Sequence, residues 1–111
     1  MTDKIVVLST VETAEQARAL ALLLIERRLA GCVNIVSGVT SVYSWKGATE
    51  QTGEFLVIIK TSRELFAELR SVVESAHPYE LPELIALPIE DGSERYLGWL
   101  AGGLKSREDA R

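Results

Sequence analysis

A β-branched, apolar run that leads into a helix-capping sequence occurs twice in this chain of 111 residues. The first run covers residues 4–9 and precedes the capping-box pattern Thr-Ala-Glu-Gln at 13–16. The second run covers residues 54–60 and precedes a similar pattern, Thr-Ser-Arg-Glu, at 61–64. Each pattern predicts a strand that is followed by a helix, so the chain is predicted to contain two related halves.

The segments after each helix are predicted to be strands as well. Residues 32–45 form one long predicted strand, in which Gly38 marks a bulge, and residues 84–89 form a fourth. A turn begins at Lys46-Gly47, and polar residues separate it from the strand at 54–60. We expect Gly31 to end the first helix and Pro78 to end the second.

A third helix is predicted from Ser93, with Leu97, Leu100 and Leu104 on one face, and residues 105–111 are predicted to be a frayed tail. The order of elements is therefore β-α-β-β-α-β-α within one domain, 1–111. This order predicts an α+β fold, the ferredoxin-like or split β-α-β antiparallel sandwich, with helices on one face of the sheet. Two elements are predicted in addition to this fold: a long hairpin between the second and third strands, and the C-terminal helix.

The strands are apolar on both faces. Phe55, Val57 and Ile59 point one way, whereas Leu56 and Ile58 point the other. Two helices cover only one face, and a bare second face would be a large apolar patch. The predicted 14-residue strand also exceeds the usual length of about 5–6 residues, so it should project and offer edges for pairing. We therefore predict a closed homo-oligomer.

Charge and composition exclude several classes of protein. The net charge of −4 disfavours a nucleic-acid partner, which usually requires a basic patch. The single cysteine, Cys32, cannot form an internal disulfide and fits a reducing compartment. No signal-peptide pattern and no apolar run of about 20 residues are present, so we expect a cytoplasmic protein without membrane insertion.

The only histidine and all three prolines lie within residues 77–88. Proline fixes the backbone path, and histidine is the commonest metal ligand. This segment presents His77, Tyr79, Glu80 and Glu83, whose imidazole and carboxylates could bind a metal ion. Alternatively, His77 bonds the last carbonyls of its helix, and the two glutamates are solvated or paired with Lys60.

Two further groups of residues are candidates for a site or an interface. Tyr43 and Trp45 share one face near the hairpin tip, where they are predicted to be interface anchors, with stacking on a small ligand as the alternative. Cys32 is predicted to be a small buried hydrophobe, with a soft contact to copper as the alternative.

Several motifs together resemble one known family, the CutA divalent-cation tolerance proteins, over residues 4–104. These motifs are Gly31-Cys32-Val33-Asn34, Ser41-Val42-Tyr43-Ser44-Trp45-Lys46-Gly47, Glu54 with Lys60-Thr61, His77-Pro78-Tyr79-Glu80 and Tyr96-Leu97-Gly98-Trp99-Leu100. The resemblance implies a ferredoxin-like homotrimer, similar to PII-type signalling proteins, with a ligand cleft between subunits and a link to copper or other heavy metals. It implies no catalytic activity.

This chain differs from some members of that family at two positions that are proposed there as metal ligands. Some relatives have a histidine and a cysteine where this chain has Ala76 and Ser9, so binding of Cu(II) or another divalent cation would rest on His77, Glu80 and Glu83. The leading hypothesis is thus a trimeric, non-enzymatic protein of divalent-cation tolerance. The alternatives are a small-molecule-binding regulatory module without a metal role and an RNA-binding domain, which the acidic charge disfavours. An enzyme has the least support, because no catalytic residue pattern is present.

Overall fold

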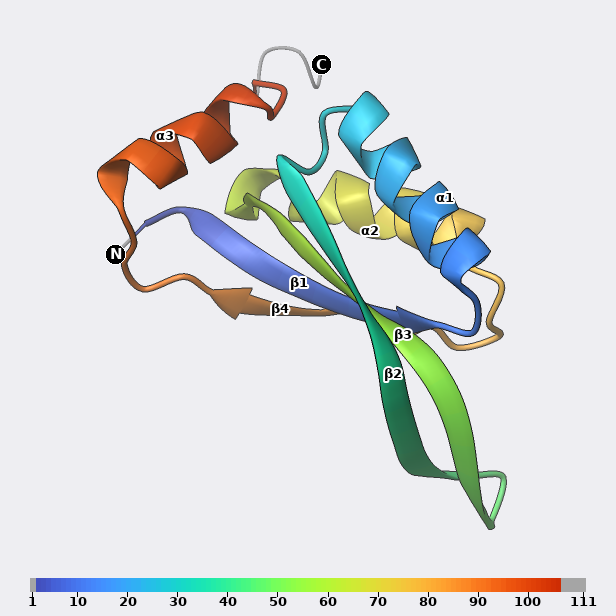
Figure 1. Cartoon of the computed structure of the whole chain (residues 1–111). Coiled ribbons are helices and arrows are strands. Elements are labelled where there is room, and N and C mark those ends of the chain that lie inside the picture. The colour runs from blue at the N-terminus through green and yellow to red at the C-terminus, as the bar shows by residue number, and fades with distance from the viewer. Residues whose placement is uncertain (1, 107–111) are drawn as a thin grey trace.

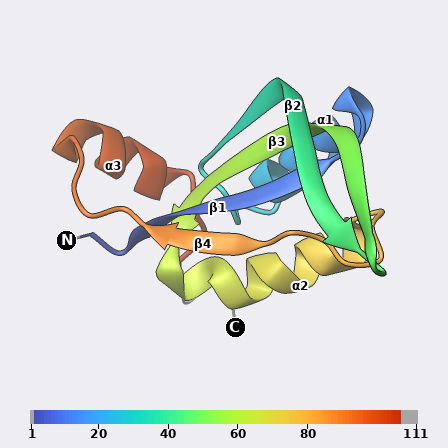
Figure 2. The same ribbon diagram turned by 90° about the horizontal axis from the view of Figure 1, so that it is seen from below.

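The computed structural model describes residues 2–106 as an antiparallel four-stranded sheet with two long helices on one face (Figure 1). The strand order is β2-β3-β1-β4, with β4 at the edge opposite β2 (Figure 2). This arrangement confirms the predicted α+β, ferredoxin-like fold. The elements are β1 (Lys4–Val11), α1 (Ala14–Glu26), β2 (Cys32–Trp45), β3 (Ala48–Ser62), the 3-10 helix η1 (Arg63–Leu65), α2 (Phe66–Ala76), β4 (Ile85–Pro88) and α3 (Glu94–Gly102).

The first predicted capping box is confirmed at the start of α1. The hydroxyl of Thr13 accepts the backbone N–H of Gln16 at 3.1 Å, and the side chain of Gln16 accepts the backbone N–H of Thr13 at 3.2 Å. The predicted end of this helix is wrong. Arg28, with φ of 58°, takes the left-handed position after the last turn, so Gly31 does not end the helix.

The second predicted capping box is also wrong. Thr61 belongs to β3, and its buried hydroxyl donates a hydrogen bond to the backbone carbonyl of Leu29 at 2.7 Å. Ser62 makes no side-chain capping bond, and the chain passes through η1 before α2 begins at Phe66. The sheet pairing of Thr61 with Ile5 therefore overrides the local capping signal.

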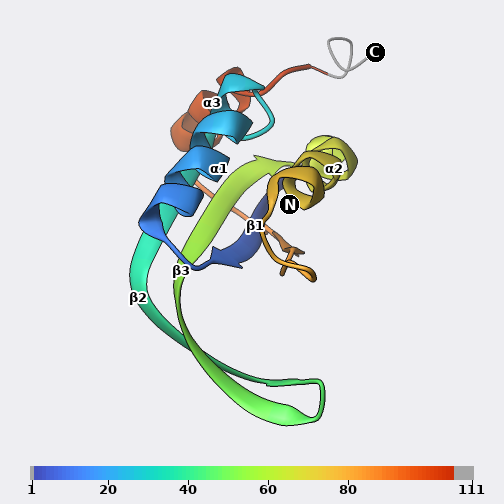
Figure 3. The same cartoon turned by 90° about the vertical axis from the view of Figure 1, so that its right-hand side faces the viewer.

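The β2–β3 hairpin is longer than predicted, because β3 begins at Ala48 rather than at position 54. A two-residue turn joins the strands, with φ of 50° at Lys46 and 82° at Gly47, as the turns that match strand twist require. We call the hairpin from Val39 to Glu54 the arm; it curves away from the helices (Figure 3). The polar residues 48–53 pair with β2 and extend the strand. Their polar side chains are tolerated because most of the arm is exposed to solvent.

Gly38 marks the predicted bulge at the base of the arm. The pairing register shifts between Val36 and Val39, and Gly38 has φ of 76°, a conformation that favours glycine. A bulge bends the strand that contains it, so the arm leaves the plane of the sheet at this point.

The core lies between the sheet and the helices α1 and α2. Val7, Val57 and Ile59 face these helices and are fully buried with Leu24 and Leu69. We call the other side of the sheet the open face, because no described segment covers it. The apolar residues of the open face are Val6, Leu8, Val36, Leu56, Ile58, Ile85 and Leu87, of which Ile85 and Leu87 are about half exposed.

Ser9 places an unsatisfied polar group in the interior, because its buried hydroxyl has no hydrogen-bond partner among the described residues. We expect Ser9→Ala to raise the free energy of unfolding by about 1 kcal/mol, since it removes the cost of an unsatisfied polar group. Thr61→Val is the matched control, because it removes a buried hydroxyl that is bonded, to Leu29, and should destabilise the fold by a similar amount. Chemical denaturation measures the free energy of unfolding of both variants. A change of the same sign in the two variants would contradict the prediction.

Candidate ligand cleft

A cleft of about 780 Å³ lies between the arm and the segment that follows α2. We call residues 77–84 the elbow. The arm contributes Tyr43, Trp45 and Glu54 to the cleft. The elbow contributes Tyr79, Glu80 and Glu83, and the end of β1 with the residue after it contributes Thr10 and Glu12. Five of the residues predicted to form a site or an interface therefore meet here, although they come from segments distant in the sequence.

His77 holds the elbow against β1. Its buried ring donates from Nε2 to the backbone carbonyl of Thr10 at 2.8 Å, and its Nδ1 accepts the backbone N–H of Tyr79 at 3.1 Å. The rings of His77 and Tyr79 also meet edge to face, with centroids 4.7 Å apart. Both ring nitrogens are thus occupied, so His77 does not fit the predicted role of metal ligand. It bonds a carbonyl of β1 rather than the carbonyls of its own helix.

Tyr79 and Glu54 connect the elbow to the arm. The hydroxyl of Tyr79 donates a 2.6 Å hydrogen bond to Oε2 of Glu54, whose side chain is only 8% exposed. Burial raises the pKa of Tyr79 well above its usual value, and the carboxylate of Glu54 raises it further. Tyr79 therefore remains a hydrogen-bond donor at neutral pH. Glu54 was not among the predicted site residues, although its carboxylate begins the apolar run at 54–60.

The rim of the cleft carries a cation from the tip of the arm. The ammonium nitrogen of Lys46 lies 3.9 Å from Oε2 of Glu80 and 5.6 Å from the ring centroid of Trp45. Further down the arm, the hydroxyl groups of Tyr43 and Thr52 are 3.0 Å apart and share a hydrogen bond. This bond fixes the ring of Tyr43 on the cleft side of the arm.

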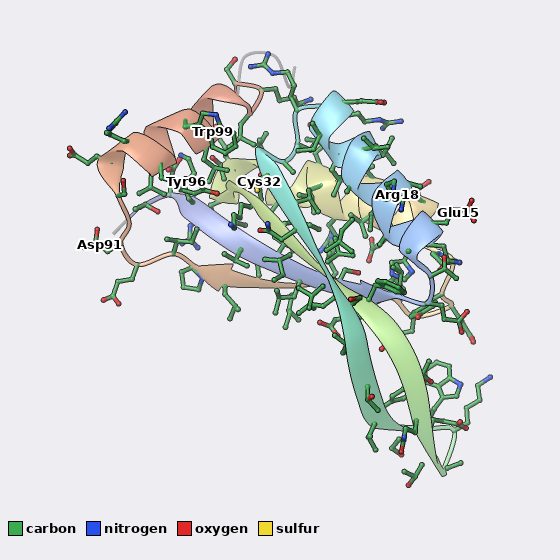
Figure 4. All side chains as sticks on the ribbon, viewed as in Figure 1. Glu15, Arg18, Cys32, Asp91, Tyr96 and Trp99 are labelled. Carbon is green, nitrogen blue, oxygen red and sulfur yellow. The ribbon has the colours of Figure 1, made fainter. Side chains whose placement is uncertain are left out.

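Lys60 and Cys32 lie outside the cleft. The ammonium group of Lys60 donates to the hydroxyl of Tyr96 at 3.3 Å, so its predicted pairing with Glu80 or Glu83 is wrong. Lys60 is near the end of β3 that meets α3, whereas Glu54 marks the base of the arm. Figure 4 shows Cys32 at the start of β2, at the α3 end of the sheet. Cys32 is partly exposed rather than buried as predicted.

The described residues contain no group of three or more His, Cys, Asp or Glu side chains that could hold a metal ion. The predicted set of His77, Glu80 and Glu83 is therefore not a metal site within one chain. Across residues 2–106, no helix has the length and apolar character needed to cross a bilayer.

Comparison with known proteins identifies a family that matches this chain. The model of the CutA1 divalent ion tolerance protein family matches residues 5–102. The divalent-cation tolerance protein CutA of Thermus thermophilus is 48% identical over 95 residues, which are 86% of this chain and 92% of that protein. The chloroplastic protein CutA of Arabidopsis thaliana is 44% identical over 102 residues, which are 92% of this chain and 56% of that protein.

The solved structures agree with this match. The structure of the divalent cation tolerance protein from Thermus thermophilus is similar with a TM-score of 0.89 at 45% identity, covering 92% of this chain and 99% of that chain. The chain spans about half the length of the plant and animal relatives that it matches. The family is named for tolerance of divalent ions rather than for a reaction. Because the match extends from β1 to the end of α3, the chain belongs to the CutA1 divalent ion tolerance protein family.

Proposed function

We propose that this chain is a non-enzymatic binding protein that serves in tolerance of divalent cations, with its ligand in the arm cleft. The observation that carries this proposal is the cleft itself, where the aromatic rings of the arm face the carboxylates of the elbow. Hydrogen bonds from His77 and Tyr79 hold the elbow to two strands, so the cleft is preformed. A preformed concave site with a few polar groups is typical of ligand-binding proteins.

We further propose that the chain acts as a cytoplasmic homotrimer, similar in architecture to PII-type signalling proteins. The uncovered apolar residues of the open face support an oligomer, because monomers seldom expose a patch of this kind. The number three rests on the family resemblance. Sedimentation equilibrium at micromolar concentration should therefore give three times the 12.2 kDa mass of the chain. A mass equal to one chain would overturn the oligomer.

Copper binding is a separate part of the proposal. Glu80 and Glu83 are exposed carboxylates, and they would hold Cu(II) together with groups from a neighbouring subunit. We expect the double variant Glu80→Gln/Glu83→Gln to weaken Cu(II) binding at least about tenfold in titration calorimetry, because both anionic oxygen donors are lost. Glu15→Gln/Glu26→Gln removes two exposed carboxylates from α1 and is the charge-matched control.

The same titration decides the role of His77. Because both of its nitrogens are bonded within the chain, we expect His77→Gln to lower thermal stability and to weaken Cu(II) binding much less than the glutamate double variant, since it loosens the elbow but removes no metal ligand. A loss of copper binding as large as in the glutamate double variant, with the melting temperature unchanged, would return His77 to the ligand set. Equal binding by the wild type and the glutamate double variant would remove copper from the cleft.

A small-molecule-binding regulatory module without a metal role is the second candidate. It is favoured by the aromatic lining of the cleft and by the absence, among residues 2–106, of a cluster that could hold a metal. Thermal shifts against a panel of amino acids and nucleotides distinguish this candidate, because a ligand that binds the folded chain raises the melting temperature further with each tenfold increase in its concentration.

A further inference from the structure

Glu54 is a buried carboxylate without a cationic partner among the described residues. Its side chain is only 8% exposed, and its oxygen Oε2 accepts the hydroxyl of Tyr79. None of the ion pairs formed by residues 2–106 includes Glu54. Burying a charge without a partner of opposite sign is costly, so this carboxylate favours any cation that enters the cleft.

The charged residues that line the cleft are all acidic. Glu12, Glu54, Glu80 and Glu83 all line it, and no Lys, Arg or His of the described part of the chain does. Burial and the carboxylate of Glu54 raise the pKa of Tyr79 most, and the carboxylate of Glu12 raises it further. A concave site with charges of one sign concentrates ligands of the opposite sign.

An alkylammonium group already lies at the rim of the cleft. The ammonium group of Lys46 is 5.6 Å from the ring centroid of Trp45 and 3.9 Å from the carboxylate of Glu80. An aromatic face and a carboxylate together are the recognition elements for an organic ammonium ion. Lys46 is about three-quarters exposed, so a competing ammonium group can displace it.

We propose that the arm cleft binds an aliphatic polyamine, with one ammonium group paired to Glu54 and another at the rim in the place of Lys46. This inference rests on the proposed role of the cleft as the ligand site and names the ligand class. The volume of about 780 Å³ suits a chain molecule rather than a bare ion. The four carboxylates do not form a metal cluster, whereas separate anionic groups suit the separate charges of a polyamine.

Titration calorimetry with spermidine tests the proposal on the full chain at low salt. Lys46→Met should bind spermidine at least about threefold more tightly than the wild type, because it removes the internal competitor from Trp45 and Glu80. Arg95→Met removes one exposed positive charge from α3 and controls for net charge. Equal gains in Lys46→Met and Arg95→Met would overturn the assignment of the rim.

Glu54→Gln should weaken spermidine binding at least about tenfold, because the buried anionic partner is lost. Glu50→Gln, an exposed arm glutamate that does not line the cleft, should leave the affinity unchanged. Since Glu54 also bonds Tyr79, the melting temperature of each variant is measured, and Lys46→Met provides a test that touches no buried group. Equal spermidine binding by Glu54→Gln and the wild type would overturn the inner position.

The wild type is also titrated with Cu(II), which separates this inference from the proposed function. Binding of Cu(II) without binding of spermidine would overturn the proposal that the cleft binds a polyamine, and it would leave the metal proposal intact. Binding of spermidine without Cu(II) supports the polyamine and removes copper from the cleft. Triethylene glycol, a neutral chain, is the negative ligand, and binding of this compound with the affinity of spermidine would overturn a role for charge.

Discussion

Gly31→Ala should lower the melting temperature by about 10 °C, which corresponds to a loss of about 3 kcal/mol in the free energy of unfolding. A Cβ atom at this position would lie 2.7 Å from both the carbonyl oxygen and the Cδ1 atom of Leu100. The side chain of Leu100 could rotate, but its carbonyl belongs to the backbone of α3. Relief of the clash therefore requires α3 to move away from the chain between α1 and β2.

Movement of α3 would also loosen the chain that follows it. The guanidinium group of Arg28 donates to the carbonyl of Leu104 at 2.9 Å, and the backbone N–H of Lys105 donates to the carbonyl of Arg28 at 2.9 Å. Lys105 in turn pairs with Glu68 of α2 at 2.8 Å. These bonds hold residues after α3 against the turn that follows α1 and against α2, so one methyl group at position 31 disturbs several elements.

Gly98→Ala is the matched control, because it adds the same methyl group within α3, where no described atom apart from the chain neighbours and the backbone of the same helix lies within 4 Å. It should raise stability by about 0.5–1 kcal/mol, since alanine favours the helix over glycine. Differential scanning calorimetry of both variants checks the pair. A melting temperature of Gly31→Ala within about 2 °C of the wild type would contradict the close packing of Gly31 against Leu100.

The second large effect is expected on assembly. Ile85→Asp places a charge on the open face, where the proposed trimer would bury this side chain against its neighbours. Burial of an unpaired carboxylate costs several kcal/mol, and each subunit would contribute one such group. Sedimentation equilibrium should show a shift from the mass of the trimer to the 12.2 kDa mass of one chain at micromolar concentration.

Leu22→Asp makes the same kind of change on the opposite side of the molecule. Leu22 lies on α1 and is 54% exposed, against 51% for Ile85, so the two substitutions cost a single chain about the same hydrophobic contact. The Leu22 variant should keep the mass of the wild type. Equal masses for both variants would show that the open face does not carry the interface.

The sheet could be predicted from the sequence because its signals are local. The β-branched runs and the Thr13 capping box predicted β1 and the start of α1, and the glycine at position 38 predicted the bulge in β2. Errors arose where tertiary contacts decide the structure. Thr61 has the local pattern of a helix cap, but a buried carbonyl of Leu29 takes its hydroxyl instead.

The candidate site was predicted less completely than the sheet. Tyr43 and Trp45 meet Tyr79, Glu80 and Glu83 in one cleft, although the two groups were predicted separately. Glu54 could not be assigned, because its role depends on the hydroxyl of a tyrosine 25 positions away. Lys60 was misplaced because charge alone does not locate a partner; its position along β3 places it beside Tyr96.

The arm is separate from the hydrophobic core, so its length can change without any change in the buried residues. None of the buried core residues in the described part of the chain comes from positions 39–53, and the two strands of the arm pair with each other in regular register. Deleting two residues from each strand, opposite one another, preserves which side chains face the cleft, because the pleat repeats every two residues. The reach of the arm, and with it the size of ligand or partner it can enclose, can therefore be lengthened or shortened in two-residue steps while the folding of the domain is left intact.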